Sequence, residues 1–282
     1  MDVRWHDSVA DFRASAVDVY RDDPVTATVE LMVLSGRLVD RNPAPLLITV
    51  WSGGKAVGAA FQTLHSPLLC SGLPERTIAS AVARISTVKK DLGSVRGPHG
   101  IVASFAAAWQ TATGALGTVR IRERLHRLDG LHSPAGVAGE ARRARPADKE
   151  LLHDWLSRFR AEALGQLVDS AADPGRVRTA KEPPNEFLLW TVAGDPVSLA
   201  GVRLPILGVS RIGPVYTPPE MRGHGYGSAV TAAAADWAIA ADAGEVVLFT
   251  DPENPASNAA YRRIGFQPVS DFARIDFPPG NR

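Results

Sequence analysis

Arg222-Gly223-His224-Gly225-Tyr226-Gly227 is the most informative stretch of this sequence. It stands between an apolar strand predicted over residues 209–217 and an Ala-rich helix predicted over residues 228–243. Alternate glycines let a backbone come close to a ligand, and the free N–H groups at a helix N-terminus attract an anion. The stretch therefore predicts a phosphate-binding loop, with an ordinary glycine-rich turn as the alternative.

The spacing of these glycines excludes two other phosphate-binding loops. A dinucleotide fingerprint, Gly-x-Gly-x-x-Gly, would need its third glycine at Ser228 when counted from Gly223, or at Val230 when counted from Gly225. The nucleotide P-loop needs Gly-Lys followed by Ser or Thr, which the stretch lacks. The expected phosphate therefore belongs to another class of cofactor.

The composition predicts a soluble globular protein of one or two domains. The chain has 282 residues, 45% hydrophobic and 22% charged, and its apolar runs are too short for a membrane span. Its one cysteine, Cys70, excludes an intramolecular disulfide and a cysteine-based metal site. Residues 1–13 lack the basic start and apolar run of a signal peptide, so we expect a cytoplasmic protein.

Hydrophobic periodicity in the second half of the chain predicts helices packed on a mixed sheet. The expected order is a helix over 147–164, strands over 187–192, 197–204 and 209–217, a helix over 228–243, a strand over 245–250, a helix over 254–264 and a strand over 267–277. This order is typical of the α/β class, here as an α+β mixed sheet.

The first half predicts nearly the same order of elements. The expected order is a capped helix from Asp23-Pro24 to near Leu38, strands over 46–51 and 56–62 around the turn Ser52-Gly53-Gly54-Lys55, a short strand over 68–70, helices over 78–85 and 101–109 around a short strand, and a half-exposed strand over 119–125. Residues 130–146 are expected to connect the two halves.

Two motifs in the second half resemble the GNAT superfamily, the acetyl-CoA-dependent N-acyltransferases. Arg222-x-x-Gly225-x-Gly227 matches the family signature Arg/Gln-x-x-Gly-x-Gly/Ala. In the later motif Asn254 begins a helix, Tyr261 lies seven residues on, and Gly265-Phe266 closes it. Helix, strand and helix lie between the two motifs in the order that the family requires.

This resemblance implies how the cofactor would be held. The stretch Arg222-Gly223-His224-Gly225-Tyr226-Gly227, with Ser228, would bind the pyrophosphate of acetyl-CoA. The backbone of Val215, Tyr216 and Thr217 would meet the acetyl carbonyl and the pantetheine arm, where this strand splays from the strand over 245–250.

The resemblance also implies roles for the late helix. Tyr261 would protonate the departing CoA sulfur, since a phenol and a thiolate are of similar basicity. Its alternative role is that of a half-buried aromatic closing the core. Asn254 and Ser257 would contact the cofactor, although Asn254 followed by Pro255 is also a helix cap.

The residues leave the general base open. Glu220 lies beside the glycine loop and His224 lies within it, but a place in the loop favours phosphate or solvent contact over proton abstraction. The strand over 209–217 carries no carboxylate. A solvent-mediated proton path is the preferred hypothesis, and loss of the basic limb of the pH profile in Glu220→Gln would contradict it.

The similar order of elements suggests a tandem protein built from two GNAT-like folds. We expect a degenerate GNAT-like domain over residues 1–132, a linker over 133–139 and a catalytic GNAT N-acetyltransferase domain over 140–282. In place of a glycine loop the first half has Ser71-Gly72-Leu73-Pro74-Glu75-Arg76, where Pro74 removes an N–H that a phosphate would need. The first half should therefore not hold CoA in the usual way.

Other partners receive little support from the residues. With 31 Lys and Arg against 30 Asp and Glu, the net charge of +1 gives no general case for nucleic acid. Arginines gather over residues 120–127 and 142–145 and could meet the CoA 3′-phosphate, nucleic acid or an acidic partner, but a solvated face is favoured. The histidines show no metal-ligand spacing, so no metal is expected.

The resulting hypothesis is an N-acetyltransferase that moves an acetyl group from acetyl-CoA to the primary amine of a small-molecule acceptor in a ternary complex. The alternatives are a non-catalytic acyl-CoA-binding or regulatory module, and a transferase that uses a larger acyl-CoA or makes an ester. A homodimer stays open, and the residues do not identify the acceptor.

Overall fold

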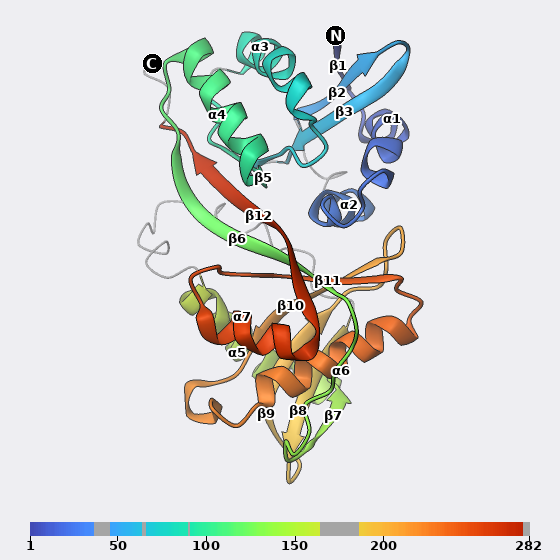
Figure 1. Ribbon diagram of the computed structural model, residues 1–282, viewed down its shortest axis with the longest axis vertical. Helices are drawn as coiled ribbons and strands as arrows, with labels where there is room; N and C mark the ends of the chain where they lie inside the picture. The colour runs from blue at the N-terminus through green and yellow to red at the C-terminus, as the bar shows by residue number, and fades with distance from the viewer. Residues whose placement is uncertain (37–45, 64–65, 90, 164–185, 279–282) are drawn as a thin grey trace. The chain divides into compact units, whose positions relative to one another are not determined.

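The computed structural model describes residues 1–36, 46–63, 66–89, 91–163 and 186–278 (Figure 1). The described residues form two compact units. Unit 1 contains residues up to 125 and from 270 onward, and unit 2 contains the described residues between 126 and 269. Each unit therefore has its own core and is described by itself.

Unit 1 alternates helices with a largely antiparallel sheet. Its elements are β1 (Asp2–Trp5), α1 (Val9–Arg21), α2 (Thr28–Ser35), β2 (Leu46–Ser52), β3 (Lys55–Gln62), β4 (Leu68–Leu69), the short 3₁₀ helix η1 (Glu75–Thr77), α3 (Ile78–Val88), β5 (Ser94–Pro98), α4 (His99–Thr113) and most of β6 (Thr118–Leu128). The strands pair in the order β1-β2-β3-β4-β5, with β4 and β5 parallel. The last strand of the chain, β12 (Phe266–Asp276), pairs antiparallel with β5 from Phe272 onward.

Unit 2 repeats this order. Its elements are β7 (Glu140–Arg143), η2 (Pro146–Asp148), α5 (Lys149–Ala163), β8 (Glu186–Val192), β9 (Asp195–Val202), β10 (Val209–Tyr216), η5 (Pro219–Met221), α6 (Tyr226–Ala240), β11 (Glu245–Thr250), α7 (Pro255–Ile264) and the start of β12. The strands β7-β8-β9-β10 are antiparallel, and β10 and β11 are parallel. The mixed α/β fold expected from the sequence is confirmed.

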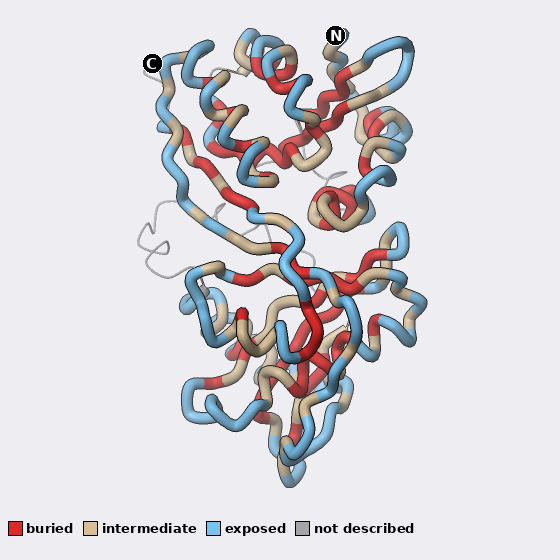
Figure 2. The backbone as a smooth tube through the Cα atoms, viewed as in Figure 1, coloured by how far each residue is buried: buried red, intermediate tan, exposed pale blue. Residues whose placement is uncertain are grey.

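Helices cover both faces of the unit 2 sheet. Leu188 packs into a cluster with α6 and the end of α7, whereas the neighbouring Leu189 packs into a second cluster with Trp155 of α5. Side chains alternate between the faces of a strand, so the two clusters lie on opposite faces. Figure 2 shows these strands as buried stretches with exposed turns at their ends.

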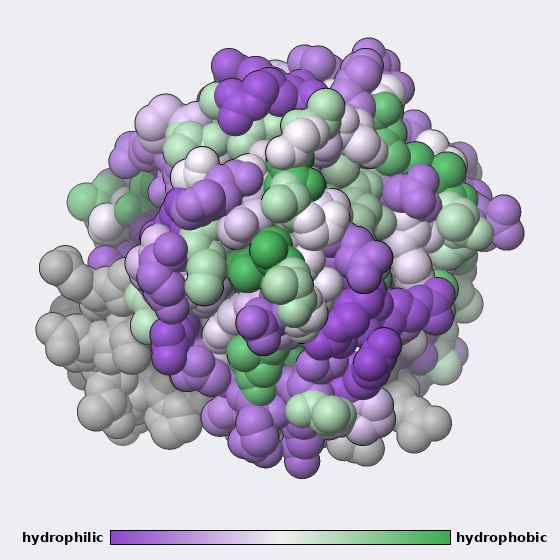
Figure 3. All heavy atoms as spheres, turned by 90° about the horizontal axis from the view of Figure 1, so that it is seen from below, coloured by the Kyte–Doolittle hydropathy of each residue, from purple (hydrophilic) through white to green (hydrophobic). Residues whose placement is uncertain are grey.

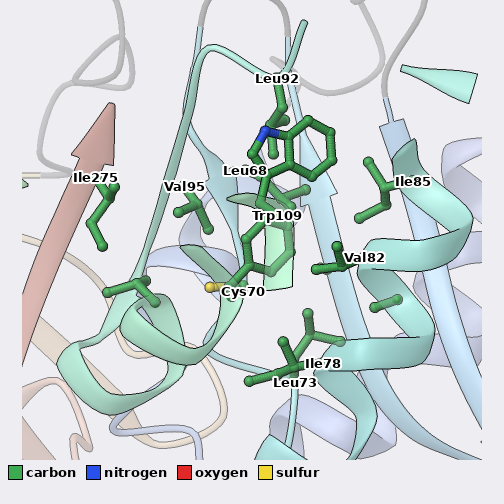
Figure 4. Packing of buried hydrophobic residues seen from close by; sticks show 14 of the residues in the cluster. Leu68, Cys70, Leu73, Ile78, Val82, Ile85, Leu92, Val95, Trp109 and Ile275 are labelled. Atoms are coloured by element: carbon green, nitrogen blue, oxygen red, sulfur yellow. The ribbon is translucent and has the colours of Figure 1, made fainter. Parts of the chain in front are cut away.

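The core of unit 1 is built from β4, β5, α3 and α4 around Cys70. Figure 4 shows the Cys70 sulfur among apolar side chains that include Trp109 and Leu73, and all three residues are almost fully buried. Cys70 is therefore a core residue. On the face seen in Figure 3, hydrophobic residues stand in small groups among hydrophilic ones.

Several predicted elements appear where the sequence placed them. The hairpin turn between β2 and β3 has Gly53 and Gly54 at φ of 56° and 79°, which a side chain would disfavour. Gly114 ends α4 with φ of 78°. These outcomes rest on local backbone preferences, which a sequence displays directly.

Other predicted boundaries were wrong. The helix expected from Asp23 begins at Thr28, because the Asp23 carboxylate accepts a hydrogen bond from the Thr26 N–H at 3.0 Å and closes a turn instead. Its expected end near Leu38 lies outside the described residues. Helix α6 begins at Tyr226, two residues before the expected start.

Three elements, β1, α1 and β7, are not among those that the sequence predicts. Helix α1 has an ordinary cap, in which Ser8 Oγ accepts from the Asp11 N–H at 3.0 Å, and it buries Phe12, Ala16 and Tyr20. Strand β7 lies inside the stretch expected to connect the two halves, and it pairs with β8 from Glu140 to Arg143. Because β7 is mostly exposed, it has no hydrophobic alternation to reveal it.

Candidate active site

The glycine loop connects η5 to α6 and is exposed. Gly225 is the N-cap residue of α6 with φ of 82°, and Gly223 has φ of 85°. Both angles lie in the left-handed region that glycine adopts without strain. A Cβ at Gly223 would meet nothing within 4 Å, so the backbone there borders open space.

The start of α6 offers N–H groups to an anion. In an α-helix the first N–H groups have no carbonyl partner within the helix, and here they belong to Tyr226, Gly227 and Ser228. The first bond back to the cap residue comes from the Ala229 N–H to the Gly225 oxygen at 3.0 Å. With the positive end of the helix dipole at the same point, the loop has the geometry of a phosphate site.

Two aromatic rings of the loop stack on each other. The rings of His224 and Tyr226 lie 5.3 Å apart between centroids and are inclined by only 12°. His224 Nδ1 lies 3.4 Å from the Met221 carbonyl oxygen. Stacking and this contact hold His224 along the loop, which favours a structural or phosphate-contact role over proton abstraction.

Strand β10 separates from β11 beside this loop. Their parallel register runs from Val209 opposite Glu245 to Ile212 opposite Leu248, whereas β10 continues to Tyr216. Beyond that register β10 has an irregularity and stays paired with β9 through Val215 and Tyr216. Among the strands that the structure describes, the end of β10 therefore pairs with β9 alone.

The backbone carbonyls at the end of β10 are already engaged. Ser198 Oγ donates to the Tyr216 oxygen at 3.1 Å and lies 2.8 Å from Thr217 Oγ1. Arg222 Nε donates to the Thr217 oxygen at 2.9 Å. Both carbonyls are therefore oriented by side chains of unit 2.

Glu162 joins this network, although the sequence reading did not single it out. One carboxylate oxygen of Glu162 accepts from Arg222 Nη2 at 2.6 Å, and the other accepts from Tyr216 Oη at 3.4 Å. Burial, and then the nearby Glu162 carboxylate, raise the pKa of Tyr216. No local pattern marks Glu162, because its partners lie 54 and 60 residues further along the chain.

Tyr261 lies on α7 at the edge of the unit 2 core. It is half-buried and packs against the same cluster as Val215, with its ring edge toward Phe266 at 6.2 Å between centroids. Burial raises the pKa of Tyr261 to about 12. The phenol therefore keeps its proton at neutral pH and can act as a donor.

The start of α7 has the cap that the sequence predicts. Asn254 Oδ1 accepts from the Ser257 N–H at 3.0 Å, and Pro255 occupies the first turn. Asn258, which the sequence reading did not single out, donates from Nδ2 to the carbonyl oxygens of Asp251 and Asn254 at 2.8 and 2.7 Å. The contact of Asn254 and Ser257 with a cofactor stays a prediction.

Glu220 and His224, the two side chains considered as a general base, are exposed. Strand β10 has no carboxylate of its own. In the part of the chain that the structure describes, His, Cys, Asp and Glu form no group of three or more that could hold a metal ion. Within the same residues, none of the helices is both long and apolar enough to cross a membrane.

The comparison with protein families identifies unit 2. Residues 149–266 match the model of the Acetyltransferase (GNAT) family, and this range contains the glycine loop and Tyr261. Residues 149–266 therefore form a GNAT-family domain. A comparison with curated proteins found no match.

Solved structures extend the likeness to the whole chain. A GCN5-related N-acetyltransferase from Kribbella flavida is 18% identical with a TM-score of 0.58, over 91% of this chain and 96% of that one. A GNAT-family acetyltransferase from Colwellia psychrerythraea is 11% identical with a TM-score of 0.60, over 99% and 100%. A tandem GNAT protein from the clavulanic acid biosynthesis pathway is 17% identical with a TM-score of 0.54, over 100% and 99%. At these identities the likeness shows the fold, which is that of a tandem GNAT protein.

Proposed function

We propose that this GNAT protein is an N-acetyltransferase that moves the acetyl group of acetyl-CoA to the primary amine of a small-molecule acceptor. The transfer would occur by direct attack of the amine within a ternary complex. The observation that carries the proposal is the exposed glycine loop at the start of α6, beside the point where β10 and β11 separate. We further propose that residues 140–282 form the catalytic domain, that residues 1–132 form a degenerate one, and that the protein works in the cytoplasm.

The donor set of unit 2 fits acetyl-CoA. The N–H groups of residues 226–228 and the positive φ angles of Gly223 and Gly225 suit the close approach of a pyrophosphate. The open space at Gly223 leaves room for phosphate oxygens. When bound, acetyl-CoA would supply an activated thioester carbonyl for attack by the amine.

The end of β10 would orient the acetyl end of the cofactor. Ser198 and Arg222 hold the carbonyls of Tyr216 and Thr217, so the strand end has a defined conformation before any ligand arrives. Backbone N–H groups fixed in advance stabilise developing negative charge without reorganisation. We assign Val215, Tyr216 and Thr217 to this role.

Tyr261 would supply the proton that the CoA sulfur needs on departure. Its phenol is protonated at neutral pH and lies on α7 against the cluster that includes Val215. For the proton on the attacking amine we propose a path through solvent, because Glu220 and His224 are exposed and the Glu162 carboxylate is engaged by Arg222 and Tyr216.

The test is a two-stage assay of the full-length protein. Calorimetry measures acetyl-CoA binding, and release of free CoA is then followed with a panel of amines that spans small polyamines, aminoglycosides, peptide N-termini and lysine peptides. Binding with turnover on a small amine supports the proposal. Binding without turnover on any amine supports a non-catalytic acyl-CoA module instead, and absence of binding to acetyl-CoA contradicts the cofactor assignment.

A further inference from the structure

Glu162 occupies an unfavourable place for a carboxylate. It lies in the last turn of α5, and the carbonyl end of a helix dipole repels a negative charge. At this position the carboxylate is compensated by Arg222 Nη2 at 2.6 Å and by Tyr216 Oη at 3.4 Å. Both partners belong to the candidate active site and neither belongs to α5.

Arg222 carries this connection into the backbone of the loop. Its Nε donates to the Thr217 oxygen at 2.9 Å while its Nη2 is held by Glu162. The guanidinium is planar and its N–H directions are fixed, so anchoring one side orients the other. The residue that comes after β10 and the first residue of the glycine loop are thereby joined to each other and to α5.

We propose that Glu162 is a positioning residue for the phosphate loop. By holding Arg222 against Thr217, it keeps the segment between β10 and α6 in the conformation that presents the N–H groups of residues 226–228 to a pyrophosphate. The inference rests on the proposed function for the identity of that ligand. The contacts themselves are independent of it.

The exposure of the Glu162–Arg222 ion pair allows the positioning role to be distinguished from a purely stabilising one. The side chains of Arg222 and Glu162 are 49% and 46% exposed, and pairs at such exposure contribute little to the free energy of unfolding. A change at Glu162 should therefore leave the melting temperature nearly unchanged. Its effect should appear in the affinity for the cofactor, because an unordered loop must be ordered when the ligand binds.

Helix α5 also provides a matched control. Arg158 pairs with Asp154 at 3.0 Å, and their side chains are 51% and 49% exposed. The pair joins an arginine to a carboxylate at nearly the same exposure as Glu162 with Arg222, but both of its members lie on α5. Asp154→Asn removes a surface ion pair and leaves the hydrogen bonds of Glu162 with Arg222 and Tyr216 in place.

The first measurement compares Glu162→Gln with Asp154→Asn in acetyl-CoA binding and steady-state kinetics. We expect Glu162→Gln to raise the Kd and the KM for acetyl-CoA by about tenfold with kcat changed by less than about twofold. Asp154→Asn should leave Kd, KM and kcat within about twofold of the parent protein. A fall of kcat at unchanged KM would overturn the positioning role and indicate proton transfer, and equal behaviour of the two variants would overturn it as well.

The second measurement needs no cofactor. Hydrogen–deuterium exchange of the peptide covering residues 217–229 should be several-fold faster in Glu162→Gln than in the parent protein, and unchanged in Asp154→Asn. If the parent protein fails to bind acetyl-CoA, the proposed function fails, while unchanged exchange in Glu162→Gln overturns the role of Glu162 independently.

Discussion

The end of β10 in unit 2 and the end of β4 in unit 1 occupy the same place in the order of elements. They differ in whether the strand end stays hydrogen-bonded to the neighbouring parallel strand. In unit 1 the pairing with that neighbour continues, because the Cys70 N–H donates to the Arg96 oxygen at 3.0 Å. A Cβ at Gly97 would lie 2.9 Å from Cys70 Sγ, so the sulfur fills the space between the strands. In unit 2 the corresponding ladder stops at Ile212 while β10 continues.

The segment after β4 is also closed by side chains of unit 1. The fully buried Glu30 carboxylate accepts from the Ser71 N–H at 3.0 Å, and burial raises the pKa of Glu30. At the start of α3, the Thr77 N–H and hydroxyl both donate to the Pro74 oxygen. The same order of elements therefore makes an open site or a closed core, depending on a few residues at one strand end.

The largest expected effect is on Tyr261. Tyr261→Phe removes the phenolic proton donor, and we expect kcat for CoA release to fall by about a hundredfold with acetyl-CoA affinity nearly unchanged. Because its pKa is about 12, the phenol is protonated throughout the neutral pH range. The fall in kcat should therefore be the same across that range. Steady-state kinetics with an amine from the panel measures it.

Tyr20 is the matched tyrosine of unit 1. It is fully buried, and burial raises its pKa well above the ordinary value, but unit 1 is expected to hold no cofactor. Tyr20→Phe should therefore leave kcat unchanged. Equal losses in the two variants would show that the contrast between the two units is wrong.

The next effect concerns Gly72, which lies just after β4. A Cβ there would lie 2.6 Å from Tyr20 Cε1 and 2.8 Å from the Ala59 oxygen, so Gly72→Ala should destabilise unit 1 by about 2 kcal/mol through overpacking. Denaturant unfolding measures this change, and acetyl-CoA affinity should stay the same. Gly100→Ala in α4, where nothing lies within 4 Å of the added Cβ, should be neutral or slightly stabilising.

A substitution at Gly225 should change the affinity for acetyl-CoA, whereas the substitution at Gly72 should change stability. Gly225→Ala places a side chain at φ of 82° in the loop, and we expect the Kd for acetyl-CoA to rise by about tenfold. The control is Gly194→Ala in the turn between β8 and β9, which has φ of 92° and open space around it. Calorimetry should find full affinity in that control, and an equal loss in both variants would assign the effect to general strain.

The smallest effect concerns how the first long helix of each unit is capped. Hydrogen bonds from Arg142 and from the Arg145 N–H hold the pKa of Asp148 at about 2, below its ordinary value. A carboxyl whose pKa is lowered on folding stabilises the fold at any pH above its unfolded-state pKa. This stabilisation is lost as the pH falls through the folded-state pKa of about 2. Asp148→Asn should therefore cost about 1 kcal/mol at neutral pH and progressively less as acid is added.

The neutral cap of unit 1 provides the contrast for this acid dependence. Ser8 Oγ caps α1 without an ionisable group, so Ser8→Ala should cost a similar amount at neutral and at acidic pH. Urea unfolding across that pH range measures both variants. An acid-independent loss in Asp148→Asn would show that the ion pair with Arg142 is not what stabilises the start of α5.

The parts of the molecule that could be predicted are those whose cause is local. The hairpin glycines, the Asn254 cap and the glycine loop before α6 follow from backbone preferences at neighbouring residues. The helix expected from Asp23 was misplaced because a short polar side chain can close a turn as readily as it can cap a helix.

The features that could not be predicted from the sequence depend on residues that are distant along the chain. Strand β12 begins in unit 2 and pairs with β5 of unit 1 from Phe272 onward, a partner that no periodicity in either strand specifies. Glu162 is similar, because an acidic residue near a helix end looks like any solvated residue until Arg222 is placed beside it.

The sequence alone reveals the GNAT signatures, the glycine loop at a helix start and the helix that carries Tyr261, because each of these depends on residues that are close together along the chain. Only the tertiary structure decided that Cys70 and Glu30 close the end of β4, and that Glu162 and Ser198 orient the end of β10. Those contacts join segments far apart in the chain, and only packing brings such segments together.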